Sequence, residues 1–139
     1  MKTSVDIKWI GNMAFEFEAD GHKLIFDAGP EVGGEGKGPK PKPFMLYALA
    51  GCTGMDVVSI LKKMRVKLKD FNVEIETETT EEHPKHYTKM HVIYTFTGSD
   101  LNLAKLQKAV SLSEERFCGV SVVYKKAMPI TSEIRVIEA

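Results

Sequence analysis

Residues Phe44–Met64, with the sequence FMLYALAGCTGMDVVSILKKM, decide the fold of this chain. Pro43 stands just before the segment, where a proline costs a helix least, and lysines gather at its end, where the helix dipole favours cations. From Phe44 to Leu61 the segment is apolar on nearly every face, interrupted only by small residues and Asp56. Because a helix that is apolar all round is typically buried, we expect a long buried central helix here.

The same segment approaches the minimum length of a membrane span, which is the main alternative. Small and polar residues within it argue against a span: Gly51, Thr53, Gly54, Asp56 and Ser59. The first residues, MKTSVDIKWI, also lack the continuous apolar stretch of a secretion signal. We therefore expect a cytoplasmic protein that does not bind a membrane, and whose two cysteines are free thiols in a reducing cytosol.

Three short strands are predicted before the helix. Thr3–Trp9, Ala14–Glu18 and Lys23–Phe26 are strand-like, the first two by alternation of apolar and polar residues, and Asp20-Gly21 is a strong hairpin signal. These strands should form an antiparallel meander. The next stretch, Gly29–Pro43, holds five glycines and four prolines, which predicts an extended and mobile connection.

After the helix, the alternating patterns of Asn72–Thr79 and His86–Thr97 predict two further strands. Ser99 or Asp100 should cap a helix that runs towards Phe117. A short apolar stretch and a last strand follow, at Cys118–Tyr124 and Thr131–Ile137. Strands first, helices between sheets and no regular βαβ repeat indicate an α+β fold, with one domain spanning residues 1–139.

Charge excludes one class of function. The 139 residues carry 19 basic and 19 acidic side chains, for a formal net charge of zero. A protein that binds nucleic acid through its phosphates normally has a clear basic excess. We therefore expect no nucleic-acid partner.

Common catalytic and ligand motifs are missing or incomplete. His83, His86 and His91 lie close in sequence, but positions 86 and 91 of a strand point to opposite faces, so we expect surface histidines and no metal site. Lys37 in GEGKGPK is not followed by Ser or Thr, which excludes a phosphate-binding loop of the Walker type. The chain has no GxSxG motif of serine hydrolases. We expect no bound cofactor.

The two cysteines are the strongest candidates for chemistry. Cys52 lies in the buried helix beside Gly51, Thr53 and Gly54, and Cys118 lies at a helix junction before Gly119. A buried cysteine is often only a small hydrophobe. If the two sulfurs meet in space, however, they form a dithiol able to cycle through a disulfide.

Both cysteine segments resemble those of the OsmC/Ohr family, most closely its YhfA-like branch. LAGCTGMDVVSILKKMR (Leu49–Arg65) is similar to the central-helix signature of that family, and SLSEERFCGVSVVYKKAMPI (Ser111–Ile130) to its second-cysteine motif. The resemblance implies antiparallel sheets around a long buried central helix, in an intertwined homodimer with two active sites at the subunit interface.

The resemblance also implies a function in the oxidative stress response. Cys52 would attack an organic hydroperoxide and become a sulfenic acid, Cys118 would resolve it as a disulfide, and a dithiol reductant would regenerate both thiols. The alternative is a slow or inactive homologue that senses redox state or binds a small apolar ligand.

Three features of this chain depart from the pattern of active family peroxidases. Where the family has a glutamate near the start of the central helix, this chain has Lys42 and Pro43, and no arginine precedes Arg65. Lysines 37, 40 and 42 could supply positive charge instead, although an ammonium cannot form a bidentate clamp. Asp56, four residues after Cys52, lies on the same helical face and would oppose a thiolate.

Overall fold

The computed structural model describes every residue of the chain, 1–139. In chain order its elements are β1 (Lys8–Gly11), β2 (Ala14–Ala19), β3 (His22–Phe26), the 3-10 turn η1 (Pro30–Val32), α1 (Phe44–Lys63), β4 (Asp70–Thr79), β5 (Tyr87–Gly98), α2 (Leu103–Leu112), the π-helical turn η2 (Ser113–Phe117), α3 (Gly119–Ala127) and β6 (Ile130–Glu138). This mixture confirms the α+β class. The chain forms two compact units, Met1–Met45 and Leu46–Ala139; that both act as one domain stays a prediction.

The first unit contains the predicted meander, an antiparallel sheet in the order β1-β2-β3. Asp20 and Gly21 form the turn between β2 and β3 with positive φ angles of 50° and 81°. The strand predicted over Thr3–Trp9 was wrong at its start, because β1 begins only at Lys8. Val5 is 91% exposed, so its alternating pattern has no apolar surface to pack on in this unit.

Asp27 organises the glycine- and proline-rich loop Gly29–Pro43. Its carboxylate accepts the backbone N–H groups of Ala28 at 2.7 Å, Lys37 at 3.0 Å and Glu35 at 3.3 Å. The loop also contains the short turn η1. The segment predicted to be an extended connection is therefore folded back on a nearly buried side chain.

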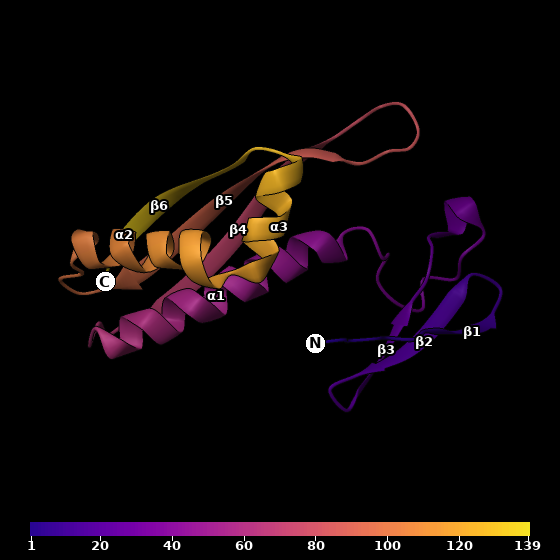
Figure 1. Ribbon diagram of the computed structural model, residues 1–139, viewed down its shortest axis with the longest axis horizontal. Helices are drawn as coiled ribbons and strands as arrows, with labels where there is room; N and C mark the ends of the chain where they lie inside the picture. The colour runs from indigo at the N-terminus through magenta and orange to yellow at the C-terminus, as the bar shows by residue number, and fades with distance from the viewer. The chain divides into compact units, whose positions relative to one another are not determined.

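The second unit is built on a sheet in the order β4-β5-β6 (Figure 1). β4 pairs antiparallel with β5, from Asp70 opposite Thr97 to Thr79 opposite Tyr87. β6 pairs parallel with β5, whereas antiparallel sheets were expected. The chain makes this parallel pairing possible because α2, η2 and α3 cross over between the two strands.

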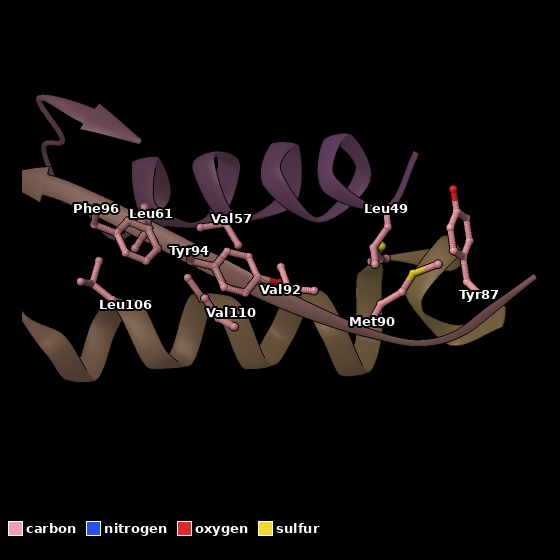
Figure 2. Close-up of a cluster of buried hydrophobic side chains, with 12 residues drawn as sticks. Leu49, Val57, Leu61, Tyr87, Met90, Val92, Tyr94, Phe96, Leu106 and Val110 are labelled. Carbon is pink, nitrogen blue, oxygen red and sulfur yellow. The ribbon is translucent and has the colours of Figure 1, made fainter. Parts of the chain in front are cut away.

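The core of this unit lies between β5 and two helices, α1 and α2 (Figure 2). Alternate side chains of β5 point towards the helices, as period-2 geometry requires. The fully buried members are Leu49, Val57 and Leu61 of α1, Met90, Val92, Tyr94 and Phe96 of β5, and Leu106 and Ala109 of α2.

α1 is long and apolar enough to cross a membrane by length and composition alone. Its buried residues Leu49, Thr53, Val57 and Leu61 nevertheless line one stripe that faces the core. The prediction of a buried helix is thus confirmed for that face, whereas Met55 on the remaining surface is 76% exposed. The sheet of this unit and helix α2 cover only one side of α1.

The start of α2 differs from the prediction. Asn102 is the N-cap, and its side chain accepts the backbone N–H of Lys105 at 3.2 Å. Neither predicted cap has this role: Ser99 donates its hydroxyl to the carbonyl of Ala139, and Asp100 has a positive φ of 52°. Because the chain turns at Asp100, the helix starts later than expected.

Candidate active site

The two cysteines are delivered by different helices of the second unit. Cys52 lies in α1, and Cys118 is the N-cap of α3. The wide turn η2 ends where the N–H of Cys118 donates to the carbonyl of Ser113 at 2.7 Å, five residues back, as in a π-helix. The Cys118 sulfur then accepts the N–H of Ser121 at 3.3 Å, which fixes its direction.

The predicted approach of the two sulfurs is confirmed. Cys52 Sγ, Cys118 Sγ and a carboxylate oxygen of Asp56 all lie within 4.8 Å of one another. Both cysteines are free thiols in this arrangement. A disulfide has an S–S bond of about 2.0 Å, so a modest side-chain movement would join them.

The two thiols differ in access to solvent. Cys52 is half-buried, whereas Cys118 is 0% exposed. The pKa of the Cys118 thiol is raised to about 11, chiefly by burial and also by hydrogen bonding to Cys52. Cys118 is therefore a buried thiol that is protonated at neutral pH, and Cys52 is the more exposed residue of the pair.

A buried chain of hydroxyl groups leads away from Asp56. Ser113 donates to Asp56 Oδ2 at 3.0 Å and lies 2.7 Å from Thr53 Oγ1. Thr53 Oγ1 lies 2.8 Å from the hydroxyl of Tyr94, which donates to Glu114 Oε2 at 2.9 Å. The three hydroxyl residues are 0% exposed, and burial raises the pKa of Tyr94 strongly. These hydrogen bonds connect the Asp56 carboxylate to the Glu114 carboxylate on another element.

Sequence reasoning missed most of this network. Helical spacing predicts Asp56 beside Cys52, but no periodic pattern points to Ser113, Tyr94 or Glu114. Ser113 and Glu114 lie inside the second-cysteine segment, which was the available signal. Their convergence depends on η2, and a π-helical turn has no clear sequence signature.

Other candidate residues lie elsewhere. His91 contacts Thr131 and Glu133 at 2.7 and 2.8 Å, and His86 contacts the carbonyl of Pro84 at 2.7 Å. The histidines do not gather into a ligand cluster. Two of the lysines considered as charge partners are in ion pairs within the first unit, Lys37 with Glu35 and Lys40 with Glu31.

Sequence comparisons place the chain among known proteins. A family model described as OsmC-like protein matches residues 34–133. The chain is 37% identical to the protein YhfA of Escherichia coli K12 over 135 residues, which cover 96% of this chain and 97% of YhfA.

Solved structures agree with the sequence comparison. A hypothetical protein from Aquifex aeolicus is similar with a TM-score of 0.86 and 26% identity, over 100% of this chain and 99% of that one. The organic hydroperoxide resistance protein OhrB of Bacillus subtilis shares the fold with a TM-score of 0.64 at 15% identity, over 96% and 98% of the two chains. On the family model and the full-length similarity to YhfA, this chain belongs to the OsmC-like protein family.

Proposed function

We propose that this protein is a cytoplasmic two-cysteine hydroperoxide reductase that acts on organic hydroperoxides. The observation that carries the proposal is the pairing of a half-buried thiol, Cys52, with a buried one, Cys118, within 4.8 Å. OhrB and a Legionella pneumophila protein of the same fold are named organic hydroperoxide resistance proteins, which supports this substrate class.

In the first step, the Cys52 sulfur attacks the terminal oxygen of the hydroperoxide. The O–O bond breaks, the sulfur is oxidised to a sulfenic acid, and the alkoxide leaves as an alcohol with the proton that Cys52 released. Asp56, whose carboxylate is within 4.8 Å of the sulfur, is placed to hold that proton between release and transfer. The hydroxyls of Ser113, Thr53 and Tyr94 connect Asp56 by hydrogen bonds to Glu114 and hold it in place.

In the second step, Cys118 attacks the sulfenic sulfur of Cys52. The S–S bond forms, and the sulfenic hydroxyl leaves as water with the Cys118 proton. A dithiol reductant then exchanges with this disulfide, which returns both thiols and oxidises the reductant. Burial suits Cys118 to this resolving role, because peroxide in solution cannot reach it directly.

We also propose that the active unit is a homodimer. An apolar groove of about 570 Å³ runs along the exposed side of α1 and includes Gly51, Gly54, Met55 and Val58. A Cβ atom at Gly51 would meet nothing within 4 Å, so packing inside this chain does not require a glycine there. Close approach of a second copy, beside Cys52, would account for the small residue.

The alternative function is a family member that reacts slowly and serves as a redox sensor or apolar-ligand carrier. One observation favours it: the sequence has no arginine before Arg65, and the described ion pairs do not place a cation on Cys52 or Asp56. Without a guanidinium, the thiolate and the leaving oxygen lose a strong charge partner.

Mass spectrometry after stoichiometric cumene hydroperoxide separates the two functions. The reductase should lose two hydrogens and yield a Cys52–Cys118 cross-linked peptide. Cys118→Ser should instead accumulate over-oxidised Cys52, and Cys52→Ser should leave Cys118 unmodified because it is buried. Two unmodified thiols in the wild-type protein would favour the alternative.

A further inference from the structure

Three different donor atoms converge at the thiol pair. Cys52 and Asp56 are one helical turn apart on α1, so their side chains lie on the same face, and Cys118 approaches from the start of α3. The two sulfurs and one carboxylate oxygen are mutually within 4.8 Å. Each is a ligand type that Zn²⁺ accepts, and thiolates select thiophilic cations over Mg²⁺ or Ca²⁺.

We propose that Cys52, Asp56 and Cys118 form a binding site for Zn²⁺ in the reduced protein. In a tetrahedral site, Zn–S bonds of about 2.3 Å put two sulfurs about 3.8 Å apart, and a sulfur and an oxygen slightly closer. The upper limit of 4.8 Å between the donors is therefore within about 1 Å of the bound geometry. Side-chain rotation of Cys52 and Asp56, neither of them fully buried, would close that difference.

Neighbouring groups already orient two of the three ligands. Ser113 donates to Asp56 Oδ2 at 3.0 Å, which leaves Oδ1 for a cation. The N–H of Ser121 points at the Cys118 sulfur from 3.3 Å and would stabilise it as a thiolate. Such outer partners fix the direction of ligands in metal sites. Ser113 is held in turn by the buried hydroxyl chain, and Ser121 lies in the first turn of α3.

The charges of the metal and its ligands nearly cancel. Binding releases one proton from each thiol to solvent, and two thiolates with one carboxylate leave a net charge of −1 on the zinc-loaded site. Three protein ligands complete only part of a tetrahedron, so the fourth position would be left for a water molecule. This ligand count is that of open zinc sites, as in zinc enzymes, rather than of closed structural ones.

Zinc and peroxide would compete for the same sulfur electrons. A coordinated Cys52 thiolate cannot attack a peroxide freely, and a Cys52–Cys118 disulfide offers no thiolate to the metal. The proposal goes beyond the peroxidase function and does not rest on it, because metal binding needs only the reduced donor set.

The test is titration of the reduced full-length protein with Zn²⁺ against a chromophoric chelator, and with Co²⁺ as a spectroscopic probe. We expect one Zn²⁺ per chain, a thiolate-to-cobalt charge-transfer band and the ligand-field spectrum of a tetrahedral site. Asp56→Asn should weaken zinc binding at least about tenfold, and Ser113→Ala should weaken it about tenfold, as loss of outer partners does. The double variant His83→Asn/His86→Asn is the matched control and should bind as the wild type does.

Alkylation of Cys52 in the wild-type protein with N-ethylmaleimide provides a test that needs no substitution. It should abolish both zinc binding and the cobalt charge-transfer band. Zinc binding that survives alkylation, or that is lost in the histidine control, would overturn the proposal in favour of an adventitious surface site. If the protein binds zinc but is not oxidised by hydroperoxide, the result supports the zinc site and contradicts the peroxidase function. If it is oxidised but does not bind zinc, the result supports the peroxidase function and contradicts the zinc site.

Discussion

Ser113 is the residue on which several parts of the site depend. Its hydroxyl donates to Asp56 and contacts Thr53, while its carbonyl accepts the N–H of Cys118. It is 0% exposed, so water cannot replace a lost partner easily. One small side chain thus links the acid on α1 to the turn that carries the second thiol.

Replacing Ser113 with alanine should therefore destabilise the protein. The change leaves the Thr53 hydroxyl with one partner fewer and Asp56 without its donor, which costs about 1–3 kcal/mol of unfolding free energy. Chemical denaturation followed by circular dichroism measures this. Ser111→Ala is the matched control, since Ser111 is exposed near the end of α2, two residues before Ser113, and should change stability by less than about 0.5 kcal/mol. Equal stability of the two variants would mean that the hydroxyl network contributes nothing.

At the scale of single elements, the sequence predicted those whose pattern reflects burial. β5 alternates because one of its faces lies against α1 and α2, and one stripe of α1 is apolar because its residues enter the core. Asn102 was missed as the cap because Ser99 and Asp100 are equally good capping residues by type, and only the turn at Asp100 excludes them. The parallel pairing of β6 depends on the path of the crossover, which local pattern does not encode.

The candidate site, like the fold, could be predicted from the sequence only in part. Cys52 and Cys118 were identifiable because they lie in long segments with a family resemblance, and Asp56 because helical spacing puts it beside Cys52. The partners of Asp56 lie far from it in sequence and meet it only through η2. Long-range contacts between small polar residues leave no periodic signal to detect.

The loop Gly29–Pro43 should loosen in acid. Hydrogen bonds from the amides of Lys37 and then Ala28 hold the pKa of Asp27 below its ordinary value of 3.8. A lowered pKa in the folded state means that the stabilisation is present above that ordinary value and is lost as the pH falls through the lower, folded value.

Amide exchange of Lys37, measured by hydrogen–deuterium mass spectrometry at neutral and acidic pH, would report this loosening. After correction for the intrinsic rate, protection of the loop should fall in acid in the wild-type protein. Asp27→Asn should lower protection already at neutral pH, because an amide oxygen is a weaker acceptor than a carboxylate. Asp6→Asn, at an exposed position, is the control and should behave as the wild type does. Loop protection independent of both pH and Asp27 would contradict this account.

At the scale of the whole molecule, the chain leaves apolar surface uncovered. Met55 is 76% exposed and Val58 is 47% exposed on the side of α1 that faces away from the core. The groove that they line has mainly apolar walls, with Phe71 and Val73 of β4 on its other side. Contiguous exposed apolar surface of this kind marks interaction sites more often than free surface. The apolar sequence of α1 is explained only in part by the core of one chain.

Met55→Lys tests whether a second copy covers that surface. Because Met55 is exposed, the substitution should change the stability of the single chain by less than about 0.5 kcal/mol. In a dimer it buries an unpaired charge, and a loss of about 2 kcal/mol or more at a central contact weakens association roughly thirtyfold. Sedimentation velocity over a concentration series should show a wild-type dimer at micromolar concentration and a Met55→Lys variant that dissociates. Leu103→Lys, at a 50% exposed position that begins α2, is the matched control and should remain dimeric. A wild-type monomer, or equal dissociation of both variants, would remove the homodimer from the proposed function.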